Sequence, residues 1–148
     1  MDFEFTAVIN RPVETVFAFF RDVDRYAGQK GSIVPVLDKV TPGPIGVGTR
    51  YHEVVRVMPF VDGEVLTEVV GYEPGRRLAY KFVALGMAGE LTYRFEAVGE
   101  GTRVVQQQSL RPAGLMRLFS PMIGAMFSRM AARRLAGIKE ALENDLFQ

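Results

Sequence analysis

The sequence predicts an α+β fold in which an antiparallel sheet of about seven strands is followed by one long C-terminal helix. Three observations support this prediction. Apolar and polar residues alternate at the start of the chain, short strand-like stretches fill its middle, and a helical apolar stripe runs through its last third. The connections between successive strands are short, which favours antiparallel hairpins because parallel neighbours need long crossovers.

The first predicted strand covers residues 2–9, where phenylalanine, alanine and isoleucine alternate with more polar residues. The alternation ends at Pro12, which suits the first position of a helix. Apolar residues at helical spacing then predict a short amphipathic helix over 13–20. Asp22 is a candidate cap for a second short helical turn that runs through Tyr26.

Six further strands are predicted in the middle of the chain, where glycine and proline mark the turns. The segment Glu73-Pro74-Gly75-Arg76 is one such turn, and Gly101 closes the last hairpin. Gly48 suits the strained backbone at the entry to a strand. The predicted strands are 33–40, 48–58, 62–71, 77–84, 88–97 and 102–110.

The last third of the chain predicts a helix from about Ala113 to Leu146, with Pro121 kinking or restarting it near Ser120. Its apolar stripe is typical of core packing. Methionine is concentrated in its first half, and methionine also suits the wall of an irregular pocket because it is flexible and polarizable. These methionines are Met116, Met122, Met126 and Met130.

The chain has 148 residues, enough for one domain spanning 1–148, and no linker or repeat divides it. The formal net charge of +1 provides no overall field that would favour nucleic acid. The chain has no cysteine, which excludes disulfides and thiolate chemistry. We find no signal peptide, and the uncharged stretch 118–128 is too short to span a bilayer. We therefore expect a cytoplasmic protein without stable membrane insertion.

Four short motifs lie along the chain: INRPVETVF at 9–17, GVGTR at 46–50, YEPGRRL at 72–78, and YRF at 93–95 followed by GTRV at 101–104. With them the chain resembles the START-related helix-grip superfamily (SRPBCC-like), in particular its polyketide cyclase/dehydrase and lipid-transport branch. The resemblance covers essentially the whole chain. It implies a curved seven-stranded sheet wrapped around the C-terminal helix, with two short helices after the first strand. It also implies a cavity for a small hydrophobic molecule between sheet and helix.

The residues that carry most enzyme chemistry are scarce. His52 is the only histidine, which removes most metal sites and the nucleophilic sites that require more. Successive strand residues point to opposite faces, so His52 points outward if Glu53 points inward. No phosphate loop or nucleophile elbow is present, and we expect no cofactor and no metal. Glu53, as a carboxylate in an apolar pocket, is the candidate for acid–base catalysis.

Polar candidates for the cavity are few. Tyr80 and Tyr93 could present a phenol to a ligand or bury the ring and hydrogen-bond to backbone. At least one of three consecutive glutamines must point inward, and Gln107 is the candidate. Arg134 could extend to the edge of the helix or meet an acidic head group. The full set of candidate ligand-binding residues is Tyr51, Glu53, Val55, Tyr80, Phe82, Leu91, Tyr93, Phe95, Gln107, Phe119, Met122, Met126, Met130 and Arg134.

These features favour binding or transport of a small hydrophobic molecule, such as a lipid, quinone or polyketide-like compound. One alternative is an enzyme of the cyclase or dehydratase type, which would use the tyrosines and a carboxylate. Another is a module whose methionine-rich helix docks to a protein or membrane. The expected partner is the hydrophobic ligand, with no nucleic acid, and the sequence leaves a homodimer open.

Overall fold

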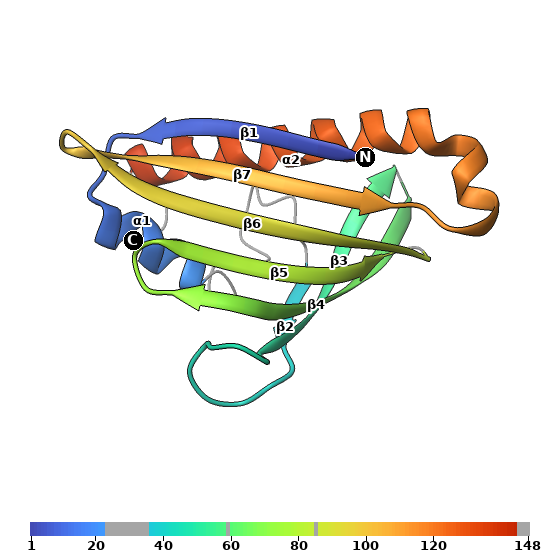
Figure 1. Cartoon of the computed structure of the whole chain (residues 1–148), viewed down its shortest axis with the longest axis horizontal. Coiled ribbons are helices and arrows are strands. Elements are labelled where there is room, and N and C mark those ends of the chain that lie inside the picture. The colour runs from blue at the N-terminus through green and yellow to red at the C-terminus, as the bar shows by residue number, and fades with distance from the viewer. Residues whose placement is uncertain (23–35, 59, 85, 145–148) are drawn as a thin grey trace.

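The computed structural model describes residues 1–22, 36–58, 60–84 and 86–144 (Figure 1). Its sheet and long C-terminal helix confirm the predicted fold class. In chain order the elements are β1 (Asp2–Ile9), α1 (Val13–Arg21), β2 (Val36–Lys39), β3 (Arg50–Met58), β4 (Val61–Glu73), β5 (Arg77–Ala84), β6 (Met87–Val98), β7 (Gly101–Arg111), the 3₁₀ helix η2 (Gly114–Phe119) and α2 (Ser120–Glu143).

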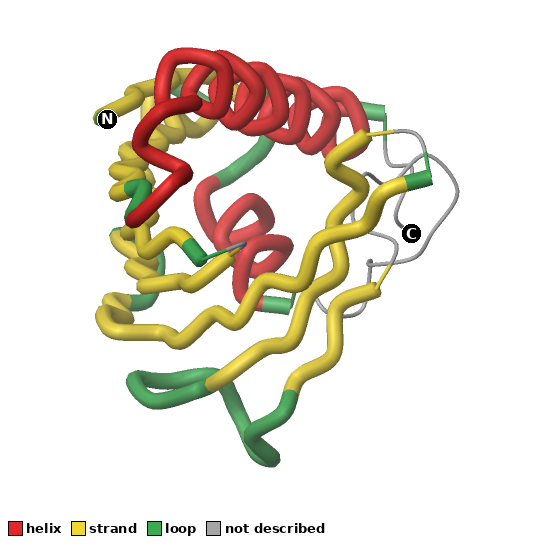
Figure 2. Tube along the Cα trace, turned by 90° about the vertical axis from the view of Figure 1, so that its right-hand side faces the viewer, coloured by secondary structure: helices red, strands yellow, loops and turns green. Residues whose placement is uncertain are grey.

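The strands of the described residues form one seven-stranded sheet in the order β1-β7-β6-β5-β4-β3-β2, and every neighbouring pair is antiparallel. All but one of these neighbours follow each other in the chain, as short hairpins require. The exception is β1, which pairs with β7 and brings the start of the chain beside its last strand. The sheet curves around the interior, and α2 lies across its concave side (Figure 2).

The α1 end of the interior is an aromatic core. The rings of Phe17 and Phe95 meet edge to face with their centroids 5.3 Å apart, and Phe20 packs on Phe95 at 5.2 Å. Such pairs add about 0.5–1.5 kcal/mol each beyond the burial of their area. Val16 and Leu78 are fully buried beside them. This cluster fixes α1 against the sheet and leaves the opposite end of the interior to be closed by α2.

The predicted C-terminal helix is divided in two. Residues 114–119 form the 3₁₀ helix η2, and the α-helix begins at Ser120 with Pro121 in its first turn, where a missing N–H costs nothing. The α-helix therefore begins where Pro121 predicted that the helix would restart, near Ser120. The predicted end of this helix at Leu146 and the predicted turn through Tyr26 lie outside the described residues. No helix in the described ranges is long and apolar enough to cross a membrane.

Candidate functional site

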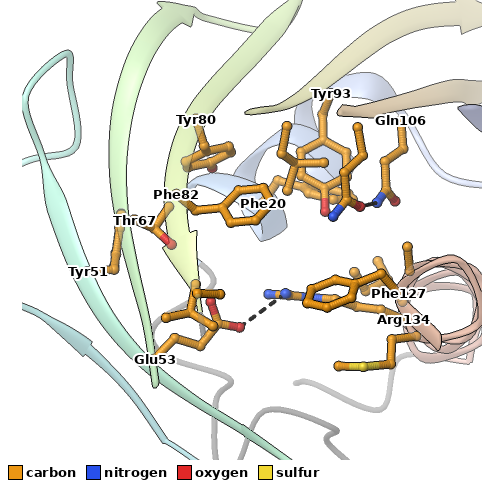
Figure 3. Close-up of a pocket in the computed structure, with 17 residues that line it drawn as sticks. Phe20, Tyr51, Glu53, Thr67, Tyr80, Phe82, Tyr93, Gln106, Phe127 and Arg134 are labelled. Carbon is orange, nitrogen blue, oxygen red and sulfur yellow. Dashed lines mark hydrogen bonds and ion pairs between the residues drawn. The ribbon is translucent and has the colours of Figure 1, made fainter. Parts of the chain in front are cut away.

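A cavity of about 140 Å³ lies between the concave face of the sheet and α2 (Figure 3). Five strands, α1 and α2 contribute to its wall, which is mostly aromatic and aliphatic. The lining residues are Phe20, Tyr51, Glu53, Val65, Thr67, Tyr80, Phe82, Ala84, Leu91, Tyr93, Gln106, Gln108, Phe127, Met130, Ala131, Arg134 and Ile138.

The two periodicities of the chain build this wall. Each strand contributes every second residue, as with Tyr51 and Glu53 on β3, because alternate side chains of a strand share one face. On α2 the wall residues follow a spacing of three and four, as Phe127, Met130 and Arg134 show. The cavity is therefore the place where the inward face of the sheet and one stripe of α2 meet.

An ion pair crosses the cavity. The Nη1 atom of Arg134 on α2 donates to Oε1 of Glu53 on β3 at 3.1 Å, and Figure 3 shows the two side chains reaching toward each other from opposite walls. The Glu53 side chain is only 9% exposed, and that of Arg134 is 27% exposed. Burial works to lower the pKa of Arg134, but the Glu53 carboxylate and the nearby Tyr93 and Tyr80 outweigh it and raise that pKa. The guanidinium therefore stays charged, and each charge of the pair compensates the other.

Two phenols face the same space. Tyr80 and Tyr93 are buried, and their rings meet edge to face with centroids 6.3 Å apart. Neither hydroxyl makes a hydrogen bond to another described residue, so the alternative of a phenol bonded to the described backbone does not hold. Burial raises the pKa of both phenols. They therefore remain protonated near neutral pH and can donate hydrogen bonds to an oxygen atom in the cavity.

Two amides complete the polar part of the wall. Nε2 of Gln106 donates to Oε1 of Gln108 at 3.4 Å, a long bond that joins alternate residues of β7 (Figure 3 labels Gln106). Thr67 lies on the opposite strand wall, beside its register partner Tyr51 (Figure 3). The cavity thus offers hydroxyl and amide groups around an otherwise apolar space, which is the usual composition of a small-molecule site.

Gly89 positions one of the aromatic wall residues. It lies directly opposite Phe82 in the sheet, and a Cβ atom at Gly89 would be 2.3 Å from Cζ of Phe82 and 2.6 Å from the carbonyl oxygen of Ser109. No other residue leaves room for the Phe82 ring to lie across the neighbouring strand. The glycine therefore determines how far this ring extends over the cavity floor.

The structure places many of the candidates from the sequence on the cavity wall. They come from three strands and α2, and they include the candidate acid Glu53. They are Tyr51, Glu53, Tyr80, Phe82, Leu91, Tyr93, Met130 and Arg134. His52 faces away from the cavity, where its Nε2 lies 3.5 Å from Glu64. The side chain of Val55 lies outside the described residues.

The prediction for Gln107 was wrong. It is exposed on the outer face, where its Nε2 donates to Glu4 at 3.1 Å. The neighbouring Gln106 lies opposite the inward-facing Tyr93 and shares its face. The sequence contained the deciding signal, because the same alternation places buried Leu110 with Gln106 and exposed Arg111 with Gln107.

Four further candidates lie away from the cavity wall. Phe95 packs into the aromatic core with Phe17. Phe119 at the end of η2 and Met122 in the first turn of α2 are both exposed. Met126 is partly buried but precedes Phe127, and one residue on an α-helix rotates the side chain by about 100° away from the wall.

Sequence reasoning also missed several wall residues. Phe127 belongs to the apolar stripe of the C-terminal helix, which is typical of core packing, and Phe20 belongs to the short helix predicted over 13–20. Gln106 and Gln108 share the inward face that strand alternation gives. The others are small or aliphatic residues whose exposure to a cavity has no sequence signal. These wall residues are Phe20, Val65, Thr67, Ala84, Gln106, Gln108, Phe127, Ala131 and Ile138.

The sequence matches one family over nearly all of its length. The model of the family described as polyketide cyclase / dehydrase and lipid transport matches residues 1–143. The chain belongs to this family. No curated protein matches its sequence significantly.

Solved structures show the same helix-grip fold. The Zhui aromatase/cyclase from Streptomyces sp. R1128 has a TM-score of 0.82 at 17% identity, with 99% of this chain and 95% of that chain covered. TTHA0849 from Thermus thermophilus has a TM-score of 0.76 at 21% identity, covering 96% and 97% of the two chains. Ara h 8.0201 has a TM-score of 0.71 at 15% identity, covering 97% and 95%. At these identities the similarity concerns the fold, and chemistry must be argued from the cavity itself.

Proposed function

We propose that this member of the family binds a small, largely apolar molecule in the cavity between the sheet and α2. The observation that carries the proposal is an aromatic wall on which the hydroxyls of Tyr80 and Tyr93 have no protein partner among the described residues. Both residues line the cavity, and a phenol hydroxyl without a protein partner can donate to a ligand or water that brings an acceptor. A carbonyl or ether oxygen would satisfy them.

The cavity volume limits what fits in this conformation. At about 140 Å³ it is close to the roughly 150 Å³ of an engineered protein cavity that holds benzene. One six-membered ring, or the ring end of a larger molecule, matches this volume. Among the classes that the sequence suggested, a quinone or a polyketide-like ring compound therefore fits better than a long acyl chain.

The charges of the wall favour an uncharged ligand. Glu53 and Arg134 are the charged residues among those that line the cavity, and they already form an ion pair. A fatty acid carboxylate would have to displace Glu53 from Arg134 and leave that carboxylate buried without its partner, which is costly. A neutral ligand with oxygen acceptors leaves the pair intact.

Thermal unfolding tests the proposal. Naphthoquinone and naphthol represent neutral ring compounds, and laurate represents an acidic acyl chain. A ligand that binds only the folded state adds about 2.7 kcal/mol at a hundredfold excess over its Kd, which raises the Tm of a domain of this size by several degrees. We expect at least one ring compound to do so and laurate to do less. Stabilisation by laurate alone would contradict the preference for a neutral ring.

Two neighbouring alanines provide a matched pair of variants. Ala131 lines the cavity and is buried, whereas Ala132 is exposed on the other side of the helix. Ala131→Phe fills the space and should abolish the ligand-induced rise in Tm, while Ala132→Phe should retain it. If both variants respond to ligand like the parent protein, binding occurs elsewhere and the proposal fails.

A second candidate function is a reaction of the cyclase or dehydratase type. The observation that favours it is that the Glu53 carboxylate and the phenols of Tyr80 and Tyr93 line one cavity. A carboxylate can remove a proton from a carbon between two carbonyl groups, and phenols can stabilise the enolate oxygen by donating hydrogen bonds. Subsequent attack of that carbon on another carbonyl would close a ring.

The exchange of the acidic C–H protons of benzoylacetone for deuterium, followed by NMR, tests this chemistry. Catalysis by Glu53 predicts that the protein accelerates exchange and that Glu53→Gln removes the acceleration while the variant still folds. Glu64→Gln is the control, because Glu64 is an exposed carboxylate on the outer face. Equal exchange with Glu53→Gln would exclude Glu53 as the base and leave simple binding as the proposed function.

A further inference from the structure

An exposed apolar patch lies outside the cavity, on η2 and the first turn of α2. We call this set the η2 patch: its members are Leu115, Leu118, Phe119 and Met122, exposed by 79%, 76%, 53% and 67%. Figure 1 shows this segment at the end of the molecule, beyond the last residues of β7. Single exposed apolar residues are ordinary on proteins, but four within eight residues at a projecting end indicate an interaction surface.

The inner side of the same segment explains why it keeps its place. Met116 is partly buried and packs against a cluster that contains Phe82, Leu110 and Ile123. The 3₁₀ turn is thus attached to the domain through one side chain, while the η2 patch points away from it. The core therefore accounts for Met116 and leaves the four patch residues without a structural role.

Along the chain, the charged residues on both sides of the η2 patch are all basic. From Gly101 to Lys139 the chain carries seven arginine or lysine residues and no aspartate or glutamate. The whole chain has a formal net charge of only +1, so the remainder is net negative. Three of these arginines are exposed and form no ion pair with a described residue: Arg117, Arg129 and Arg133.

The order of these groups along α2 suits a lipid surface. Met122, Met126, Arg129 and Arg133 follow one another at spacings of four, three and four, so they lie along one side of the helix. An apolar tip followed by cations is the pattern of interfacial segments, which bury apolar side chains at the acyl boundary and place basic ones near phosphate groups. No helix in the described ranges could cross the membrane, which agrees with binding at the surface.

From these observations we propose that η2 and the N-terminal half of α2 form a reversible docking surface for an anionic lipid bilayer. The apolar tip inserts at the boundary of the acyl chains, and the arginines contact lipid head groups. This inference does not depend on the identity of the cavity ligand or on any reaction in the cavity.

Co-sedimentation with lipid vesicles tests the proposal. The parent protein should bind vesicles of equimolar phosphatidylcholine and phosphatidylserine and bind phosphatidylcholine alone far more weakly. Arg129→Gln/Arg133→Gln should weaken binding to the anionic vesicles about 30-fold, the equivalent of about 1 kcal/mol for each arginine. Arg76→Gln/Arg94→Gln is the control with the same net charge, because both residues are exposed on other parts of the molecule and should leave binding unchanged.

A second pair of variants tests the apolar tip. Leu118→Gln/Phe119→Gln should weaken binding at least tenfold, as expected for two exposed apolar side chains that enter the bilayer. Leu66→Thr/Val83→Thr removes two exposed apolar residues from the outer face of the sheet and should have no effect. All four residues are exposed, so circular dichroism should show folded protein in each case.

Three results would overturn the proposal. They are absence of binding to anionic vesicles, equal binding to both kinds of vesicle, and unchanged binding by the variants of the η2 patch. A stable dimer in size-exclusion chromatography that Leu118→Gln/Phe119→Gln dissolves would instead assign the η2 patch to a second copy of this chain.

Discussion

The C-terminal half of α2, residues 131–143, presents Leu135, Ile138 and Leu142 to the large core cluster, whereas residues 120–130 bury only Ile123 and Gly124. The two halves belong to one continuous helix, yet three large buried side chains anchor the C-terminal half and one, Ile123, anchors the N-terminal half. The C-terminal half, which we call the anchored half, sets the position of the helix and also lines the cavity with Ala131, Arg134 and Ile138. The N-terminal half lines it with Phe127 and Met130 and, in addition, exposes Met122 to solvent.

Polar contacts reinforce the anchored half. Nζ of Lys139 donates to the carbonyl oxygen of Val8 at 2.7 Å and also contacts Glu143 at 2.8 Å. The backbone N–H of Asn10 donates to the Glu143 carboxylate at 3.1 Å, and Arg11 donates to the carbonyl oxygen of Glu143 at 2.6 Å. These bonds tie the end of α2 to the segment between β1 and α1. The N-terminal half instead approaches the start of the chain at Gly124, which lies close to Met1 and to Phe3 of β1.

Truncation of core side chains tests this comparison with the largest expected effect. Leu135→Ala should lower the free energy of unfolding by about 2–5 kcal/mol, because it removes a buried side chain and leaves a cavity. Met122→Ala, in the exposed turn, should change it by no more than about 0.5 kcal/mol. Urea unfolding followed by circular dichroism measures both values. A loss for Met122→Ala as large as that for Leu135→Ala would show that the first turn of α2 is anchored as strongly as the C-terminal half.

Breaking the ion pair between Glu53 and Arg134 should give the next largest change in the free energy of unfolding. Glu53→Leu should cost about 1–3 kcal/mol, less than the 3–5 kcal/mol of a fully buried pair, because Arg134 remains 27% exposed. The double variant Glu53→Leu/Arg134→Leu should recover most of this loss, since it leaves no uncompensated charge in the cavity. A double-mutant cycle in urea unfolding measures the coupling, and additive losses would show that the two charges act independently.

The sequence predicts the fold better than it predicts the candidate site. The strands were predictable because Pro74-Gly75 and similar turns punctuate the chain and because alternation is a strong signal. The division of the C-terminal helix was predictable only in part. Pro121 signals the restart of the helix, but nothing in the residues before it requires a 3₁₀ helix rather than an α-helix.

For the candidate site, the sequence predicted the strand faces well and the long-range pairing poorly. Tyr80 and Phe82 followed from alternation within one strand. The Glu53–Arg134 pair did not, because its partners are 81 positions apart and come together only through the curvature of the sheet and the placement of α2. The phase of the helix was the other error, since a shift of one residue exchanges Met126 for Phe127.

Replacing glycines in the two halves of α2 with alanine should give a smaller change, and this change should raise the stability of the protein. Gly137 is exposed on the anchored half, and a Cβ atom there would meet nothing within 4 Å. Gly137→Ala should therefore stabilise the protein by about 0.4–1 kcal/mol through helix propensity and unfolded-state entropy. Gly124→Ala should gain less, because its Cβ atom would be 2.7 Å from Sδ of Met1 and that side chain must move. Equal gains in urea unfolding would show that the contact with Met1 places no constraint on the N-terminal half.

The smallest effect concerns the pH dependence of the anchored end. Hydrogen bonds from the Lys139 side chain and the Asn10 backbone lower the pKa of Glu143. Because the native pKa lies below that of the unfolded chain, the ionised carboxylate stabilises the fold at neutral pH. This contribution is lost as the pH falls from the ordinary carboxyl range, about 4.3, through the lowered native value. Glu143→Gln should therefore have a slightly lower Tm than the parent protein at pH 7, and the difference should vanish in acid.

Glu140→Gln is the control, because Glu140 is exposed on the same stretch of helix and forms no ion pair with a described residue. A difference in Tm that persists unchanged below about pH 3, where carboxyl groups are protonated, would show that Glu143 contributes through packing rather than through its charge, and the polar anchor of α2 would then rest on Arg11 and the backbone.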